Sequence, residues 1–426
     1  MNKNIISLLK IPGFFVTDVQ IEKEEIIIYA RKRSKTARCM CGKRSRKLKD
    51  YRSPSKILHM MLCNQKVYLV FQKRRFTCGN CSKLFTEPIS FLESYQRASI
   101  FVKHHALERL ADSSFKATNA RIGISYGGLT SLLKKVFTLE TINWSEQKVK
   151  TDIVKTGSGD GIQNDQKQQE FIRLGIDEHH LGKRHKYLVT IANLLTGKPI
   201  HILQDDKQST LRKFLRQLPD TVKEAIDEVC IDMRRSFLTA IAKELPNTRI
   251  VIDHFHLIQD ANRRVQEARK IEEDVQEKIK GNGPKTIRWK LLTRNKEDLQ
   301  GEQDKLIRYY LHTYPAIAVF YSCKEKLRDM YKTGSKEEAE LILTELIKSM
   351  KASEYAELGL WARSLTFYQP YILNYFDNHT TNAVTEGLHR KFKLIQRQAY
   401  GFRNPEVYAR RIMLACLPLP FIYPHI

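Results

Sequence analysis

Between residues 171 and 256, short apolar runs alternate with amphipathic segments. Residues 171–177 form an apolar run, which predicts a buried strand. Residues 185–203 contain two further apolar runs around a Gly-containing turn, and this pattern predicts a hairpin. The segments that follow predict, in order, a helix at 210–218, a strand at 229–233, a helix at 236–245 and a strand at 248–253. Strand–helix–strand repeats of this kind imply a mixed sheet with helices packed on it.

The predicted order of three strands, a helix, a strand, a helix and a strand is that of the RNase H-like fold. Two of these strands end in an aspartate, Asp177 and Asp232. An isolated carboxylate at the end of a buried strand is costly unless its charge is compensated, and Mg²⁺ is the simplest candidate. Adjacent strand residues face opposite sides, so only one of Asp177 and Glu178 can point into such a site. The alternative is that both aspartates cap the turns after their strands.

Residues 382–397 predict a helix with one polar face. At about 100° per residue, a narrow stripe on this helix contains Asn382, Glu386, Arg390, Lys393 and Arg397. The opposite face is apolar and is available for the core. Glu386 is the one carboxylate of the stripe and lies at the helix start, which makes it the candidate third acid. The alternative is a surface helix on which Glu386 pairs with Arg390, an interaction worth roughly 0.2–0.5 kcal/mol.

Two pairs of cysteines lie in the N-terminal part of the chain, after a likely strand pair within residues 1–37. They are Cys39 and Cys41 in a CxC pair and Cys78 and Cys81 in a CxxC pair. Four thiolates suit a tetrahedral structural Zn²⁺, so the pattern predicts one zinc in a ribbon. The CxC spacing is one residue tighter than the common knuckle. The alternative is four thiols without a metal.

Residues 91–140 predict three helices, the last two separated by Gly123 and capped at Ser125. This arrangement suits a helix-turn-helix, and a plain helical hairpin is the alternative. A long amphipathic stretch after His256 predicts an all-α insertion that contacts DNA or another subunit. The multidomain α/β chain is therefore expected to contain a zinc ribbon (1–90), a helix-turn-helix domain (91–150), a linker (151–170), the first part of the RNase H-like core (171–256), the all-α insertion (257–375), the glutamate helix of the core (376–410) and an irregular tail (411–426).

The charge of the chain adds information about its partner. The sequence contains 73 Lys and Arg but 47 Asp and Glu, which gives a net charge of +26. Such an excess favours a polyanionic partner, double-stranded DNA before a membrane surface. Residues 31–56 alone hold twelve Lys or Arg against one acid, and phosphate contacts are expected there. The candidate DNA contacts are Arg390, Lys393, Arg397, Lys134, Lys135, Arg74 and Arg75. No apolar run approaches the ~20 residues of a membrane span. Eight cysteines without an export signal suggest the reducing cytoplasm as the location. Association with the nucleoid is expected when DNA is bound.

Four stretches carry a family resemblance: LGIDEHHLGKRHKYL, VCIDMRRSF, VIDHFHL and TNAVTEGLHRKFKLIQRQAYGFRN. With the cysteine region, they resemble the ISL-three family of bacterial insertion-sequence transposases. The resemblance implies an Asp-Asp-Glu triad of Asp177, Asp232 and Glu386 that holds two Mg²⁺ or Mn²⁺ ions. It also implies an accessory pair, Asp253 and His256, near the site, with Asn382 close by. The family often carries asparagines where this chain has His389 and Arg390.

The function expected from these features is that of a DNA transposase. It would bind the terminal inverted repeats of an insertion sequence, hydrolyse a phosphodiester and join the freed 3′-hydroxyl to a second strand, with Mg²⁺ as the catalytic metal. A homo-oligomer is expected in the DNA complex. Two alternatives remain open at this point: a DNA-binding regulator with a silent RNase H-like core, and a nuclease of the same fold.

Overall fold

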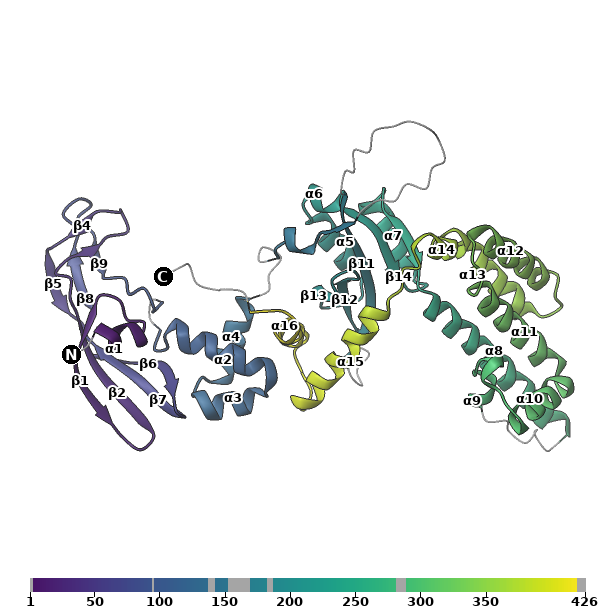
Figure 1. The fold of residues 1–426 in the computed structure, drawn as a ribbon, viewed down its shortest axis with the longest axis horizontal. Coiled ribbons are helices and arrows are strands. Elements are labelled where there is room, and N and C mark those ends of the chain that lie inside the picture. The colour runs from purple at the N-terminus through teal and green to yellow at the C-terminus, as the bar shows by residue number, and fades with distance from the viewer. Residues whose placement is uncertain are drawn as a thin grey trace. The chain divides into compact units, whose positions relative to one another are not determined.

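The computed structural model describes residues 3–93, 96–136, 142–151, 169–181, 187–280 and 289–419. The chain divides into two compact units, which are described separately (Figure 1). The first unit contains residues 1–142 and 392–426, and the second contains residues 143–391. The first unit is therefore discontinuous in sequence. Most of the predicted linker, 152–168, lies outside the described residues, and its two ends belong to strands.

A four-stranded sheet opens the first unit, in the order β1-β2-β7-β6. β2 and β7 are parallel, whereas β1–β2 and β6–β7 are antiparallel pairs. Alternation along β7 buries Val67, Leu69 and Phe71 on one face, where Phe91 packs against them. The predicted strand pair within residues 1–37 is present as β1 and β2. The elements are α1 (Lys3–Leu8), β1 (Phe14–Ile21), β2 (Glu25–Lys32), β6 (Ser55–Leu62) and β7 (Gln65–Phe71).

Two smaller sheets form the ribbon that carries the cysteines. β3 pairs with β4, and β8 lies between β5 and β9 in a three-stranded sheet. The β3–β4 and β8–β9 turns hold one cysteine pair each. The strands are β3 (Ala37–Arg38), β4 (Arg44–Ser45), β5 (Leu48–Tyr51), β8 (Arg74–Thr77) and β9 (Leu84–Thr86).

The described part of the first unit also contains the helices α2 (Ile100–Asp112), α3 (Phe115–Ile122), α4 (Tyr126–Lys134) and α16 (Pro405–Cys416). Gly123 ends α3 in the left-handed region at φ 84°, and the Ser125 hydroxyl accepts the Gly128 N–H to cap α4. The helix–turn–helix order is present, and its role in DNA binding stays a prediction. α16 packs on α2 and α4, and buried Arg411 donates to the Ser113 carbonyl at 3.3 Å. Residues 411–416, predicted to be an irregular tail, are therefore helical.

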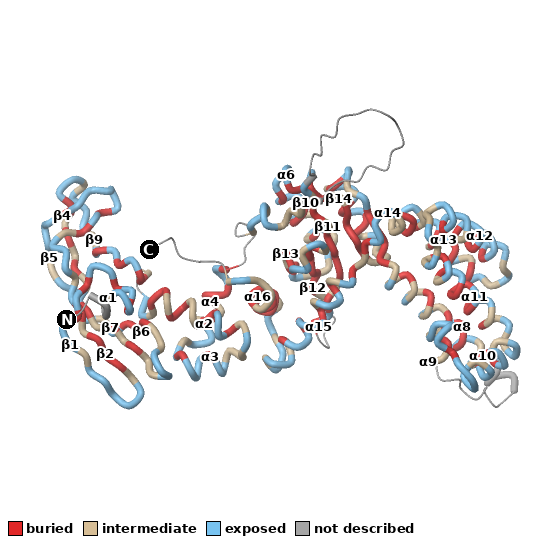
Figure 2. Tube along the Cα trace, in the orientation of Figure 1, coloured by how far each residue is buried: buried red, intermediate tan, exposed pale blue. Residues whose placement is uncertain are grey.

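A mixed sheet is the centre of the second unit, in the order β13-β12-β11-β14-β15, with β10 pairing the start of β11. β11 is antiparallel to β12 and parallel to β14, and β14 is parallel to β15. Buried residues run through β11, β12 and β14 (Figure 2). The predicted order of strands and helices is observed, with the short α6 added. The elements are β10 (Val149–Thr151), β11 (Gln169–His180), β12 (Tyr187–Asn193), β13 (Lys198–Leu203), α5 (Gln208–Arg216), α6 (Asp220–Lys223), β14 (Ile226–Ile231), α7 (Arg235–Glu244) and β15 (Arg249–Ile252).

After β15, the described elements up to Asn378 are all helical. α8 packs on α11, and α12 packs on both α11 and α13. Among the described residues, no helix is long and apolar enough to cross a membrane. The α-helices are α8 (His254–Lys280), α9 (Trp289–Leu292), α10 (Glu302–Thr313), α11 (Pro315–Met330), α12 (Lys336–Lys351), α13 (Ala356–Leu373) and α14 (Tyr375–Asn378).

Helix α15 (Ala383–Gln398) approaches the sheet very closely at Gly175 of β11. A Cβ atom added to Gly175 would lie 2.6 Å from Asn382 Oδ1 and 2.6 Å from Leu194 Cδ2. The chain before α15 is held by Glu228, which is 1% exposed and accepts hydrogen bonds from the Asn378 amide at 2.6 Å and from the Thr380 hydroxyl. A glycine on the sheet and a buried carboxylate beneath the connection thus fix where α15 begins.

We predict that Gly175→Ala lowers the free energy of unfolding by about 1–3 kcal/mol, because the added methyl group must displace packed atoms. Gly359→Ala in α13 is the matched control, since its Cβ meets no atom within 4 Å. That substitution should be neutral or stabilise by up to about 1 kcal/mol. Urea unfolding of both variants measures the difference, and equal stabilities would contradict the close approach of α15.

Candidate functional site

Three aspartates follow three isoleucines that are aligned on adjacent parallel strands. Ile176 of β11 pairs with Ile231 of β14, and Ile231 pairs with Ile252 of β15. The next residue on each strand is an aspartate: Asp177, Asp232 and Asp253. Because the carboxyl ends of parallel strands meet at one edge of a sheet, the register alone brings these carboxylates together.

One imidazole bridges two of the three carboxylates. His256 lies in the first turn of α8, and its Nδ1 is 2.8 Å from Asp232 Oδ1 and 2.9 Å from Asp253 Oδ2. The hydrogen bond goes to Asp253, and Asp232 Oδ1 is left buried with no hydrogen-bond partner among the described residues. A buried carboxylate oxygen without a donor is a position at which a cation would be stabilised.

The pKa values at this edge follow from burial and from the crowding of charge. Burial raises the pKa of Asp177 to about 7, and the Asp232 carboxylate adds to that shift. Burial lowers the pKa of His256, but the adjacent carboxylates of Asp232 and Asp253 outweigh it and raise this pKa to about 10. Burial raises the pKa of Asp253, whereas hydrogen bonds from His256 and the Asn382 N–H lower it, and the net shift is downward.

The donor set fits a divalent metal. Asp177, Asp232 and His256 each offer one ligand atom, and these three atoms lie within 4.8 Å of one another. Carboxylate oxygens are the ligands that Mg²⁺ prefers, and Mn²⁺ also accepts an imidazole nitrogen. Glu386 does not belong to this group of described residues. Its side chain is 48% exposed and lies 3.4 Å from Arg390 in an ion pair.

Helix α15 nevertheless touches the acidic edge on both sides of Glu386. One turn before it, the backbone N–H of Asn382 donates to Asp253 Oδ1 at 3.2 Å. One turn after it, His389 Nδ1 lies 3.4 Å from Asp177 Oδ2, and His389 Nε2 is hydrogen-bonded to the Thr190 hydroxyl at 2.9 Å. Residues spaced by four and then three share one helix face. The Glu386 position therefore faces the same edge of the sheet.

His389 is the residue of this site that reasoning from the sequence missed. It was noted as a departure from the family pattern, yet it is buried against Asp177. Its spacing of three residues from Glu386 was the available signal. Glu178, next to Asp177, points away and pairs with Arg234, as strand alternation predicted.

The predicted DNA contacts differ in how far they are already engaged within the protein. On α15, Arg390, Lys393 and Arg397 are exposed. Lys134 lies 3.5 Å from Glu406, and Lys135 lies 3.3 Å from Glu93.

The predicted DNA contacts in the ribbon are Arg74 and Arg75, and both are engaged in closer ion pairs within the protein. Arg74 is buried and binds Glu87 through two nitrogens, at 3.0 and 2.6 Å. Arg75 binds both carboxylate oxygens of Asp50. These two arginines hold the ribbon together, so other cations are better placed for phosphate contacts.

The four predicted zinc ligands come together in the ribbon. The thiol sulfurs of Cys39, Cys41, Cys78 and Cys81 lie within 4.8 Å of one another. Cys39 and Cys81 are 3.7 Å apart, and Cys41 and Cys78 are 3.6 Å apart. Zn–S bonds of about 2.3 Å in a tetrahedron require S–S edges of about 3.8 Å, which these distances match. Backbone N–H groups of Cys81 and Asn80 lower the pKa of Cys78 to about 6, which favours the thiolate that a metal needs.

Comparisons with known proteins support the zinc ribbon and match a transposase family. A transposase family model of the ISL-three (ISL3) group matches residues 174–412, more than half of the chain, and a zinc-finger model of transposase IS204/IS1001/IS1096/IS1165 matches residues 37–81. The chain is 23% identical over 396 residues to the transposase for insertion sequence element IS1001 of Bordetella parapertussis, with 91% of each chain covered. It is 22% identical over 264 residues to the transposase for insertion sequence element IS1557 of Mycobacterium tuberculosis, covering 57% of this chain and 59% of that one.

One solved structure is also similar, the Drosophila P element transposase strand transfer complex. Its match has a TM-score of 0.37 and 11% sequence identity, and it covers 75% of this chain and 93% of that one.

We predict that His256→Gln destabilises the metal-free protein in a pH-dependent way. The pKa of His256 is raised in the folded state, so its stabilisation is fully present below its ordinary value of 6.5 and is lost as the pH rises through about 10. At pH 6 the loss should be about 3 kcal/mol, because a buried pair is broken. Thermal unfolding in a chelator measures the difference, with exposed His312→Gln as the control. A difference that grows with pH would contradict the bridging role.

A second substitution tests the zinc site. Cys78→Ser should release the metal, because three thiolates no longer close the tetrahedron. Cys63→Ser is the matched control, since Cys63 is exposed and lies outside the cluster. Metal content measured by mass spectrometry should fall only in the first variant. Equal zinc in both proteins would remove Cys78 from the site.

Proposed function

Because the chain belongs to the ISL-three family of insertion-sequence transposases, we propose that it cuts DNA at the ends of its element and joins the freed 3′-hydroxyl to a target strand. The observation that carries this proposal is the alignment of Asp177, Asp232 and Asp253 at one sheet edge, with the α15 face of Glu386 against it. Asp177, Asp232 and Glu386 are the proposed catalytic residues.

The residues at this edge would hold the metal ions of the reaction. Two Mg²⁺ or Mn²⁺ ions, when bound, supply the Lewis acidity that activates a water or hydroxyl nucleophile and stabilises the leaving oxygen. Asp177 and Asp232 are the proposed shared ligands. Glu386 is the proposed further ligand, since its ion pair with exposed Arg390 is worth less than about 1 kcal/mol and is easily given up.

The surrounding side chains determine the position and the protonation of the carboxyl groups that would bind the metal. Asp177 must lose a proton before it can act as a ligand, because its pKa is near 7. His389 contacts the same carboxylate and is itself fixed by Thr190, so we assign it as a positioning residue for Asp177. The imidazolium of His256 neutralises part of the charge on Asp232 and Asp253 and keeps both carboxylates in place while the site is empty of metal.

Double-stranded DNA is the proposed partner. The net charge of +26 supports it, and the exposed cations of α15 extend along the helix that begins beside the acidic edge. The ribbon and helices α2–α4 are proposed to bind the terminal repeats of the element. The helices from α8 to α14 are proposed to contact DNA or a second subunit. A homo-oligomer in the DNA complex and a cytoplasmic location stay predictions.

The decisive test is cleavage of a supercoiled plasmid that bears the element's terminal repeats. With Mg²⁺, the wild type should cut and join strands, whereas Asp232→Asn and Glu386→Gln should lose activity by more than about 10³-fold, because several kcal/mol of transition-state stabilisation are lost. Glu337→Gln, an exposed glutamate in the first turn of α12, is the control for Glu386→Gln and should stay active.

The outcomes separate the alternatives. Cutting without joining would favour a nuclease of the same fold. Metal-independent binding without cleavage would favour a silent DNA-binding regulator. Full activity of Glu386→Gln would remove that residue from the site.

A further inference from the structure

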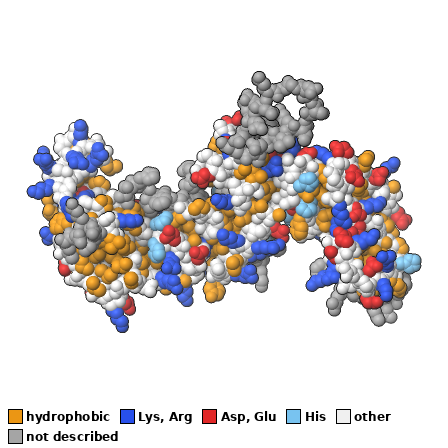
Figure 3. Space-filling view, in the orientation of Figure 1, with side chains coloured by type: hydrophobic (Ala, Val, Ile, Leu, Met, Phe, Trp, Pro, Cys, Tyr) orange, Lys and Arg blue, Asp and Glu red, His pale blue; other side chains and the backbone are white. Residues whose placement is uncertain are grey.

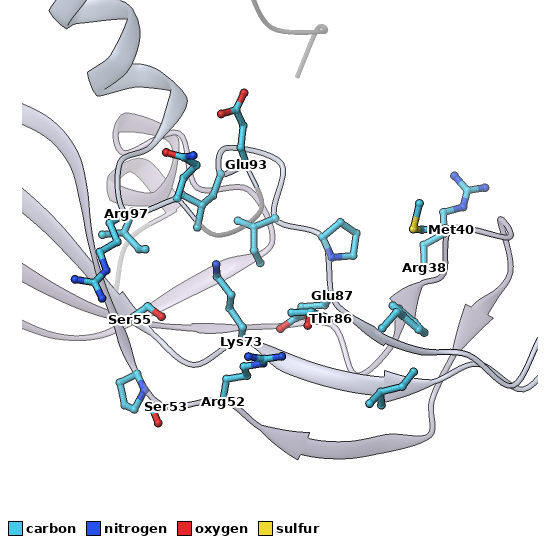
Figure 4. Close-up of a pocket in the computed structure, with 18 of the residues that line it drawn as sticks. Arg38, Met40, Arg52, Ser53, Ser55, Lys73, Thr86, Glu87, Glu93 and Arg97 are labelled. Carbon is cyan, nitrogen blue, oxygen red and sulfur yellow. The ribbon is translucent and has the colours of Figure 1, made fainter. Parts of the chain in front are cut away.

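A cleft of about 1270 Å³ opens in the first unit between the zinc ribbon and the end of the four-stranded sheet. Its lining comes from the first cysteine knuckle, the β5–β6 connection, Lys73 before β8, and the segment after β9. Lys73 points from the floor into the open space with Arg52 beside it, and Arg38 and Arg97 lie toward opposite ends (Figure 4). Small-molecule sites usually occupy about 300–1,000 Å³, so this cleft has room for a larger ligand.

The acids of the cleft are already neutralised by cations from outside it. Glu87 is bound by Arg74 at 2.6 Å, and Lys32 lies 3.6 Å away. Glu93 is bound by Lys103 at 2.7 Å. Since none of these three cations lines the cleft, the acids contribute little negative charge to its interior.

Of the five cations that line the cleft, only Lys56 is in an ion pair among the described residues, with Glu25 at 2.7 Å. Among the described residues, no ion pair engages Arg52, Lys73, Arg97 or Arg38. Lys73 is half-buried, and both its burial and the nearby Arg52 charge lower its pKa. Like charges that face one another in a partly desolvated cleft repel, and an anionic ligand would relieve this repulsion. The cleft therefore favours an anionic ligand.

Apolar side chains line the spaces between these cations. Pro54 and Pro88 are exposed in the wall, Ile89 is buried behind it, and Leu84 of β9 is 45% exposed. Met40, between two zinc ligands, is fully exposed at the rim. Alternating cationic and apolar surface suits a chain of phosphates linked by deoxyribose. The space-filling view shows Lys and Arg gathered over the ribbon around β4 (Figure 3).

We propose that this cleft binds the sugar–phosphate backbone of one DNA strand, with Arg52 and Lys73 as its central phosphate contacts. The inference rests on the proposed function and deepens it. Arg74 and Arg75 bind Glu87 and Asp50 within the ribbon. The phosphate contacts of this region are therefore assigned to Arg52 and Lys73 in their place. The cleft positions DNA and carries no base specificity of its own.

The test measures binding of a terminal-repeat duplex to the full-length protein by fluorescence anisotropy at several salt concentrations. Arg52→Gln and Lys73→Gln should each weaken binding about 5- to 30-fold at low salt and reduce the slope of log K against log salt by about 0.9, the value for one lost phosphate contact. Lys73→Arg keeps the charge and should retain the wild-type slope. Lys23→Gln, exposed in the β1–β2 turn outside the cleft, is the matched control for loss of one charge.

Zinc content and melting temperature establish that each variant is folded. Unchanged binding and slope in folded Arg52→Gln and Lys73→Gln, while the wild type still cleaves plasmid, would overturn the cleft and leave the proposed function standing. A wild type that neither binds terminal repeats nor cleaves would overturn the proposed function, and the cleft assignment with it. Calorimetric titration with deoxyadenylate and with inorganic phosphate distinguishes the phosphate source, because micromolar binding that Arg52→Gln abolishes would make the cleft a nucleotide or phosphate site instead.

Discussion

Crowding of carboxylates in a poorly solvated place is the constraint on which the second unit depends. Asp177, Asp232 and Asp253 would repel one another at the sheet edge if nothing positive stood among them. The imidazole of His256 meets part of that need, and it leaves one oxygen of Asp232 without a donor. Other features serve this arrangement: Gly175 lets α15 lie on the sheet, and buried Glu228 fixes the chain that leads to it. The metal ions proposed for this site would supply further positive charge at this edge.

The sequence predicted those features of the site that depend on a few neighbouring residues. Apolar runs located the strands and, at their ends, Asp177 and Asp232, because strand ends are set by burial over a few residues. Asp253 was predicted only from the family resemblance. The spacing from Glu386 was the one local signal for His389, and its hydrogen bond could not be predicted, since it depends on α15 lying across β12 at Thr190. The acidic partners of Arg74 and Arg75 could not be predicted for a similar reason. The charge of both arginines is visible in the sequence, but their partners Glu87 and Asp50 come from strand pairing between separate segments.

The C-terminal segment illustrates the same limit on the scale of a domain. An irregular tail was predicted for this segment. It contains Pro418, Pro420 and Pro424, and proline interrupts a helix. The helix before them begins at Pro405, where proline is well tolerated in the first turn, and it ends at Cys416. What the sequence did not reveal is that α16 packs on α2 and α4, nearly three hundred residues earlier, and that Arg411 donates to the carbonyl of Ser113 at the end of α2.

Because α16 packs on helices that are translated much earlier, the assembly of the first unit depends on the order of synthesis. A ribosome produces α2 to α4 early, yet the helix that packs on them emerges only after the whole second unit. At roughly 5–20 residues per second, their apolar faces wait on the order of tens of seconds for α16. A polypeptide that stops before α16 leaves this surface open, even though its ribbon and acidic residues are present. Completion of the unit that carries the ribbon therefore requires that the whole second unit has been translated first.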